Sequence, residues 1–211
     1  MAAIRPTQFL SRIPFTIILV LVVAAVSWGG IANLQPFRQN LFEKIGERVG
    51  LLPWHMQRGE LFRLAMSVFF ARPGIELTLA LVLVAVGVGT GERRVGTGKA
   101  ILVFVGSHLA VLLTLTIALA FRNQRTEGMW ENLLAVAFWV GPAAGYSGCL
   151  GVGCQKQPEP RRVALLSVIG GLLFARAVWA GHAYGIASVR HAPDLARLLA
   201  FGLGVGIGRR L

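Results

Sequence analysis

A serine between small residues, Ser147 in the stretch 145–148 (GYSG), is the first candidate for chemistry in this sequence. A serine hydroxyl becomes an effective nucleophile only when a neighbouring base accepts its proton. The same residue can instead let two helices approach closely, because serine and glycine are small. Ser147 is therefore both a candidate nucleophile and a candidate packing residue, and the residues around it decide between the two roles.

The composition predicts an integral membrane protein. Of the 211 residues, 55% are hydrophobic and 14% are charged, and the mean hydropathy is +0.66. Several apolar runs approach or exceed 18 residues, which is the length of a membrane span. We expect an all-α polytopic membrane protein in which residues 1–211 form a single membrane domain.

Six membrane-spanning helices are predicted, over residues 13–33, 74–90, 99–121, 133–153, 162–181 and 193–208. The first run is too long for a signal-peptide core and lacks an A-x-A cleavage site, so we expect a retained first span. The long connection 34–73 has apolar residues at helical spacing among charges, which predicts interfacial helices.

The net charge of +12 is concentrated in short connections between the apolar runs. This distribution follows the positive-inside rule and argues against nucleic-acid binding. It predicts cytoplasmic N- and C-termini. The basic residues that face inward in this orientation are Arg5, Arg12, Arg93, Arg94, Lys99, Lys156, Arg161, Arg162, Arg209 and Arg210. High Ala, Gly, Val and Arg usage is typical of a GC-rich bacterial genome and indicates the plasma membrane.

Four segments, taken in order, resemble the rhomboid family of intramembrane serine proteases. They are GELFRLAMSVFFARPGIELTLA (59–80), ERRVGTGK (92–99), GYSG (145–148) and ARLLAFGLGVGIG (196–208). The resemblance implies a six-transmembrane-helix rhomboid-like bundle with an interfacial helical first loop. Its core covers about residues 59–208, and residues 1–58 supply an extra N-terminal span and the first loop.

The resemblance places Ser147 at the family's nucleophile position, but the other catalytic positions differ. Rhomboids pair the serine with a histidine near the start of the sixth span, where this chain has Arg197. The family's His-x-x-x-Asn motif on the second span, which helps to form the oxyanion hole, is replaced by Glu76 and Ala80. Arginine stays protonated and cannot act as a base. Because losing the base of a triad costs about 10⁴–10⁶ in rate, we expect no useful proteolysis by the family's mechanism.

His191 is the best alternative base for Ser147. However, Pro193 and Asp194 look like the start of the last helix, which leaves His191 outside the membrane. We expect solvated loop histidines at His55, His182 and His191, and a packed polar histidine on the third span at His108. Glu76 is a second alternative base, if it is buried close to the serine.

Three charged residues, Glu76, Arg176 and Arg197, fall within or at the ends of predicted spans. An unpaired charge in a bilayer costs about 2.5–3.5 kcal/mol on insertion scales. We favour a Glu76–Arg197 ion pair that joins the second and sixth spans. The alternatives are a Glu76–Arg176 pair, an Asp194–Arg197 pair on one helix, an Arg176 that snorkels outward, and a Glu76 that faces outer water.

Small residues predict close helix packing around the serine. The glycines in question are Gly141, Gly145 and Gly148 on one side of the fourth span, and Gly204 and Gly208, which form a GxxxG on the sixth. Arg197 lies seven residues before Gly204 on the same face, so we expect it beside Ser147. These features favour a structural serine. Cys149 and Cys154 are expected to be small packing residues.

The sequence therefore favours a rhomboid pseudoprotease, which is a catalytically inactive membrane protein. The resemblance implies that it binds transmembrane segments of client proteins through the lateral opening between its second and fifth spans. The first alternative is an active intramembrane serine endopeptidase that uses Ser147 with an unorthodox base. The second is a small membrane transporter component with Glu76, Arg176 and Arg197 along a polar path, although no inverted repeat is present. Apart from the lipid bilayer and such clients, the sequence indicates no partner, cofactor or metal.

Overall fold

The described part of the chain is entirely helical. The computed structural model describes residues 13–32, 67–69, 75–123, 141–184 and 191–211. Its elements are α2 (Pro14–Ala32), the 3-10 turn η1 (Ser67–Phe69), α6 (Ile75–Val95), α7 (Thr97–Asn123), α9 (Ala143–Gln155), α10 (Arg161–Tyr184) and α11 (Ala192–Arg210). The all-α prediction is confirmed for these residues. The predicted interfacial helices of 34–73 lie outside them, apart from η1.

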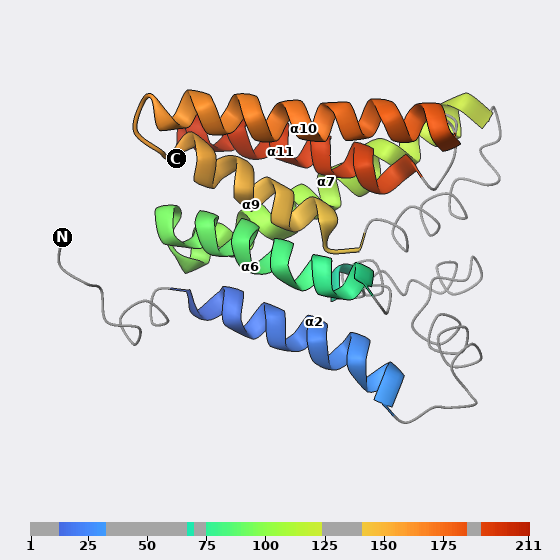
Figure 1. Cartoon of the computed structure of the whole chain (residues 1–211), viewed down its shortest axis with the longest axis horizontal. Helices are drawn as coiled ribbons and strands as arrows, with labels where there is room; N and C mark the ends of the chain where they lie inside the picture. The colour runs from blue at the N-terminus through green and yellow to red at the C-terminus, as the bar shows by residue number, and fades with distance from the viewer. Residues whose placement is uncertain (1–12, 33–66, 70–74, 124–140, 185–190) are drawn as a thin grey trace.

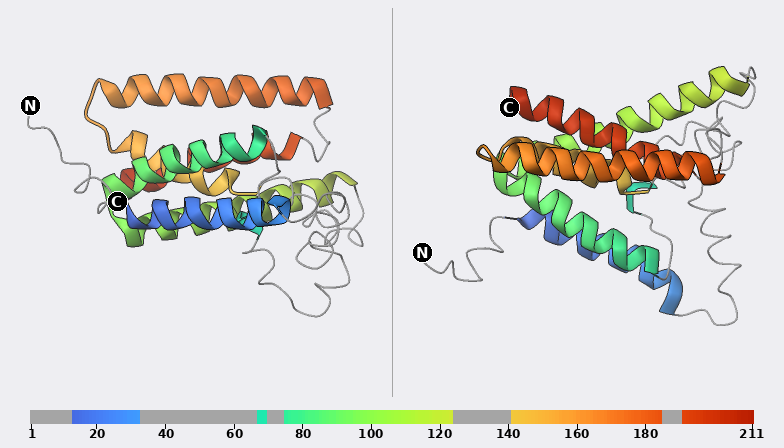
Figure 2. Two further views of the ribbon diagram at one scale, coloured as in Figure 1. Left: turned by 60° about the horizontal axis from the view of Figure 1, so that its bottom comes forward. Right: turned by 45° about the horizontal axis from the view of Figure 1, so that its top comes forward.

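The short helix α9 lies at the centre of the bundle (Figures 1 and 2). It packs mainly against α11, α6 and α7, while α2 packs on α6 and α10 packs on α11. Within α9, every residue except Leu150 and Gln155 is buried. A helix rich in glycine and alanine can be enclosed in this way because small side chains let neighbouring backbones approach closely.

Glycine turns set two of the helix boundaries. Gly96, with φ +83°, separates α6 from α7, and Gly141, with φ +47°, precedes Pro142 directly before α9. Both angles lie in the left-handed region that glycine adopts without steric cost. The predicted span over 133–153 is therefore not one continuous helix, because Gly141 has a left-handed conformation and α9 begins at Ala143. Residues 133–140 lie outside the described ranges.

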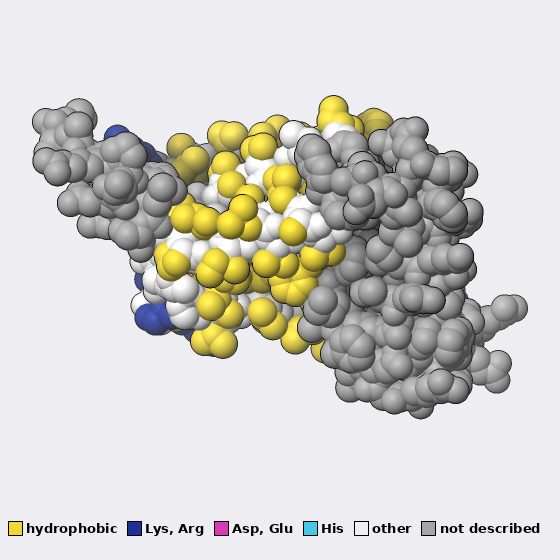
Figure 3. All heavy atoms as spheres, turned by 90° about the horizontal axis from the view of Figure 1, so that it is seen from below, with side chains coloured by type: hydrophobic (Ala, Val, Ile, Leu, Met, Phe, Trp, Pro, Cys, Tyr) yellow, Lys and Arg dark blue, Asp and Glu magenta, His cyan; other side chains and the backbone are white. Residues whose placement is uncertain are grey.

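The surface of the bundle is largely apolar along its length (Figure 3). The most exposed helix is α10, on which Leu172, Phe174 and Val178 expose 67%, 60% and 56% of their surface. Its buried side chains, among the residues described, are Ala177 and Ala180. Water would disfavour so much exposed apolar surface, which is far larger than that of ordinary soluble domains.

Two helical stretches, Thr97–Leu115 and Arg161–Ala183, are long and apolar enough to cross a membrane, and Pro14–Ser27 is a shorter apolar stretch. Six such helices were predicted from the sequence. The described chain shows fewer because α9 has only 13 residues. In addition, α11 carries Asp194 and Arg197 in its first two turns, which lowers its hydropathy.

The ends of the helices that carry basic residues gather at one end of the bundle. Figure 1 places the C-terminal ends of α6, α9 and α11 at the same end as the N-terminal ends of α7 and α10. In Figure 3, Lys and Arg side chains lie at this end of the apolar face. A hydrogen bond of 2.7 Å from Arg94 Nη2 to Gln157 Oε1 joins the end of α6 to the connection between α9 and α10.

Candidate functional site

Ser147 lies in the second turn of α9 and is 1% exposed. The residues on either side of it contact different helices. The carbonyl of Tyr146 lies against Gly87 of α6, where an added Cβ would be 2.6 Å from the oxygen. Gly148 lies against Ser107 of α7 and Gly204 of α11. Ser147 is therefore in the tightly packed middle of the bundle, where α6, α7, α9 and α11 meet.

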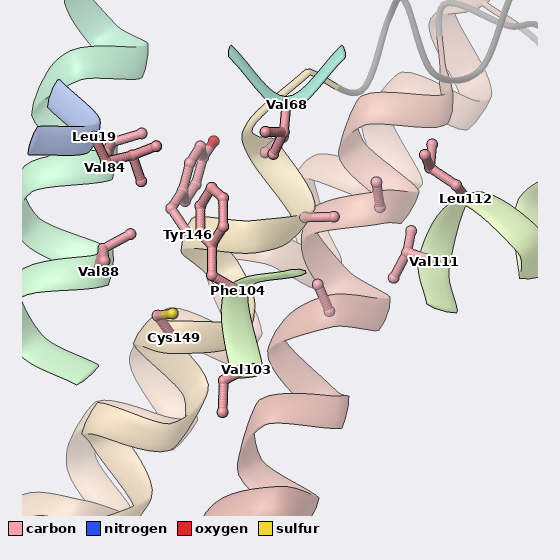
Figure 4. Packing of buried hydrophobic residues seen from close by; sticks show 14 of the residues in the cluster. Leu19, Val68, Val84, Val88, Val103, Phe104, Val111, Leu112, Tyr146 and Cys149 are labelled. Carbon is pink, nitrogen blue, oxygen red and sulfur yellow. The ribbon is translucent and has the colours of Figure 1, made fainter. Parts of the chain in front are cut away.

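The side chain of Arg197, on α11, reaches the residue next to this serine. Its Nε donates to Tyr146 Oη at 2.8 Å, and its Nη1 donates to Asp194 Oδ1 at 2.7 Å. The Tyr146 ring belongs to the central apolar cluster between α6 and α7 (Figure 4). The guanidinium is thus held by a buried hydroxyl and a carboxylate, and it offers no lone pair that could accept a proton from Ser147.

Asp194 accepts hydrogen bonds from two guanidinium groups. Its side chain is 5% exposed, and its Oδ1 also accepts a hydrogen bond of 3.3 Å from Nε of Arg176 on α10. The Arg176 guanidinium in addition lies 5.0 Å from the centre of the Trp179 ring, in a cation–π contact. One carboxylate at the start of α11 therefore ties α10 to α11.

Of the ion pairs expected for Arg197, the structure shows the one with Asp194 on the same helix. The described hydrogen bonds of Arg197 go to Asp194 and Tyr146, and Arg176 uses Asp194 as well. Glu76 lies in the first turn of α6, and its side chain is outside the described part of the chain. Ala80, one turn later, is half-buried and packs against the central apolar cluster.

Asp194→Asn is expected to lower the stability of the protein in detergent by about 2 kcal/mol, because the variant leaves two guanidiniums beside a neutral amide. Arg176→Gln is expected to cost less than about 1 kcal/mol, since its side chain is 57% exposed and its contact is longer. Thermal unfolding followed by circular dichroism compares the two variants. An Arg176 variant that is the less stable of the two would contradict this order.

His191, expected as a solvated loop residue, is buried. It is 4% exposed because it caps α11 against α10, where its Nε2 donates to the Ala177 carbonyl at 2.8 Å. A Cβ on Gly181 of α10 would lie 3.1 Å from its ring. The predicted start of the last helix is confirmed, with Pro193 in the first turn of α11. His191 therefore joins two helices, and its ring lies against α10 rather than α9.

The other histidines differ in their surroundings. His108 on α7 is 2% exposed, as expected for a packed polar residue. His182 is exposed near the end of α10, which fits the expected loop position only approximately because α10 extends to Tyr184. His55 lies outside the described residues.

Four of the five predicted packing glycines lie in close contacts between helices: Gly145 against Phe104, Gly148 against Ser107, Gly204 against Gly148, and Gly208 against Gln155. The fifth, Gly141, forms the turn before α9 instead. The sequence interpretation missed a further set on the α6 and α11 sides of α9, comprising Gly87, Gly91, Gly151 and Gly153. The GxxxG spacing of Gly87 and Gly91 is a signal that could have indicated them.

A buried carboxylate, Glu92, was also missed. It is 1% exposed and accepts hydrogen bonds from the backbone N–H groups of Phe15 and Thr16 at 3.0 and 2.9 Å. The hydroxyls of Thr16 and Thr97 donate to it at 2.6 and 2.8 Å. These N–H groups belong to the first turn of α2, where Pro14 has none to donate. Glu92 therefore caps α2 from the end of α6.

The two cysteines are buried free thiols, and Cys149 Sγ lies 3.5 Å from the Ala100 carbonyl oxygen. Among the described residues, no three His, Cys, Asp or Glu side chains gather in a way that could hold a metal ion.

Compared with known proteins, the chain matches no protein family, no curated protein and no solved structure.

Proposed function

We propose that this chain is a polytopic plasma-membrane protein with a six-span rhomboid-like bundle, cytoplasmic termini and no proteolytic activity, which binds transmembrane segments of client proteins. Its apolar surface supports a membrane location, since lipid hydrocarbon accommodates exposed Leu, Val and Phe side chains at no cost. The basic helix ends at one end of the bundle support the orientation, because Lys and Arg are retained on the cytoplasmic side.

The position of Arg197 is the main support for the proposal that the protein has no proteolytic activity. The resemblance places a catalytic histidine here, and the arginine that replaces it is bound to Tyr146, the residue before Ser147. The guanidinium of Arg197 carries a permanent positive charge, which the Asp194 carboxylate on the same helix neutralises. At the position where the resemblance implies a base for Ser147, the described structure thus has a cation, and covalent catalysis by serine requires a base.

Client binding is supported by the loose attachment of α10. Only 11% of the apolar window in its membrane-length stretch Arg161–Ala183 is buried, and α10 meets the rest of the bundle through small residues, the Arg176–Asp194 contact and the His191–Ala177 hydrogen bond. A helix held by so little packing can separate from its neighbours at low cost. This is the side on which the rhomboid resemblance implies a lateral opening.

Reaction with a fluorophosphonate serine probe tests the inactive assignment. The parent protein, purified in detergent, is expected to label no more than Ser147→Ala, because Arg197, at the position of the family's base, cannot accept the proton of the hydroxyl. Arg197→His and the double variant Arg197→His/Ser147→Ala show whether a restored imidazole gives labelling at Ser147. Labelling of the parent at Ser147 would instead favour an active intramembrane protease.

A photo-crosslinking residue placed at Phe174 tests client binding in cells. This position is 60% exposed on α10 and is expected to give discrete adducts with membrane proteins in cells. The matched control is Leu102, which is 74% exposed on α7 and away from α10. Equal adducts at both positions would indicate non-specific contact and contradict a client site at α10.

A further inference from the structure

A groove of about 490 Å³ lies between α7 and α11, on the far side of α11 from Gly204 and Gly208. Val111 and Thr114 of α7 form one wall. The other wall includes Leu199, Gly202, Gly206 and Arg210, which recur at helical spacing and so share one face of α11. In the right-hand view of Figure 2, α7 and α11 cross each other.

The α11 side of the groove leaves free space because Gly202 and Gly206 have no side chains. A Cβ added to Gly202 or to Gly206 would meet no atom within 4 Å, whereas a Cβ on Gly204 would overlap the backbone of α9. The hydroxyl of Thr114 is already satisfied by the Ala110 carbonyl at 2.7 Å, so the wall presents its methyl group without an unmet donor. The groove is therefore an apolar channel suited to a flexible hydrocarbon chain.

Among the described residues that line the groove, the cation is Arg210, at one end. Arg210 is the last residue of the lining face and is exposed at the C-terminal end of α11. This is the end of the bundle at which the other basic helix ends gather. A ligand that fills the groove thus meets apolar side chains along its length and a guanidinium at its end, which matches a lipid tail joined to an anionic headgroup.

We propose that the groove binds an acyl chain of an acidic phospholipid, with the lipid phosphate on Arg210. The inference rests on the proposed membrane location. A phospholipid fits better than a partner helix because the lining cation, Arg210, stands at the membrane-surface end, where lipid phosphates lie, and the rest of the lining is largely apolar. The lipid would fill the gap that Gly202 and Gly206 leave between α7 and α11.

Thermal unfolding in detergent tests the proposal, with dioleoyl-phosphatidylglycerol or dioleoyl-phosphatidylcholine titrated into the purified protein. Phosphatidylglycerol is expected to raise the unfolding temperature at a lower concentration than phosphatidylcholine. Arg210→Gln should weaken the apparent affinity for phosphatidylglycerol about fivefold and that for phosphatidylcholine less, because the choline cation already offsets the charge of its phosphate. The control Arg209→Gln removes the same charge at an exposed neighbour that does not line the groove.

Gly206→Leu fills the groove and is expected to abolish stabilisation by both lipids, while Gly171→Leu, at an open position on α10, leaves it intact. Gly202→Val serves as the second filling variant if Gly206→Leu does not fold. Equal effects of the two arginine variants, or lipid stabilisation that survives both filling variants, would overturn the proposal. Release of the parent protein from membranes by alkaline carbonate would instead overturn the proposed membrane location.

Discussion

Glu92→Ala is expected to lower the free energy of unfolding by about 3 kcal/mol or more, a larger loss than that expected for Asp194→Asn. The carboxylate accepts four hydrogen bonds, from the N–H groups of Phe15 and Thr16 and the hydroxyls of Thr16 and Thr97. Alanine leaves these donors buried without an acceptor, and it removes a negative charge from the positive end of α2. Because α2 begins at these residues, its attachment to α6 weakens with them.

Glu92→Gln distinguishes the contribution of the negative charge to stability from that of the hydrogen bonds. The amide keeps one acceptor oxygen but presents an NH₂ group to donors, and neutral hydrogen bonds are about half as strong as charge-assisted ones. The expected loss is therefore intermediate, at roughly half that of alanine. Glu159→Ala is the control, since Glu159 is 63% exposed and pairs with Arg162 at the surface, and it should cost under about 1 kcal/mol. Equal unfolding temperatures for Glu92→Ala and Glu159→Ala would contradict the capping role.

The helices of this protein follow closely from local signals. Apolar runs predicted α7, α10 and α11 to within a few residues at most ends, and Pro193 marked the start of α11. The exceptions have local causes as well. Gly141 and Pro142 form a turn directly before α9, so this helix begins at Ala143. Arg93 and Arg94 favour extension of α6 because cations stabilise a helix C-terminus.

Contacts between distant residues could not be predicted in the same way. Glu92 lies 76 residues from Thr16 in the sequence, so nothing in its neighbourhood distinguishes a buried cap from an exposed loop carboxylate. The partner of Arg197 was predictable in part, because Asp194 is one helical turn away. Its second partner, Tyr146, lies 51 residues away and depends on how α9 and α11 pack.

The burial of His191 shows the same limit of sequence reasoning. Its place beside Pro193 correctly predicts the end of a connection, and such positions are usually solvated. In this protein the small residues Ala177 and Gly181 on α10 create the space that the ring fills. His191, which the sequence suggested as a replacement base for Ser147, therefore links α10 to α11.

Gly204→Ala is expected to destabilise the protein by roughly 1–2 kcal/mol, although alanine is the better helix former by about 1 kcal/mol. The change in stability is expected to be a loss because of the atoms that the new methyl group would contact. A Cβ at this position would overlap the backbone carbonyl of Gly148 on α9. Backbone atoms cannot rotate away as a side chain can, so α9 and α11 must separate. Gly204→Val should be worse still, since it adds two more methyl groups to the same contact.

Gly202→Ala is the matched control, because it makes the same substitution on the same helix where a Cβ meets nothing within 4 Å. It should be neutral or stabilising by up to about 1 kcal/mol, from helix propensity alone. Thermal unfolding in one detergent compares the two, and a Gly204 variant as stable as the Gly202 variant would refute close α9–α11 packing. The α9–α11 contact also holds Arg197 against Tyr146. Gly204→Ala should therefore loosen the contact of the Arg197 guanidinium with Tyr146, so the glycines that pack the bundle also hold this cation in place.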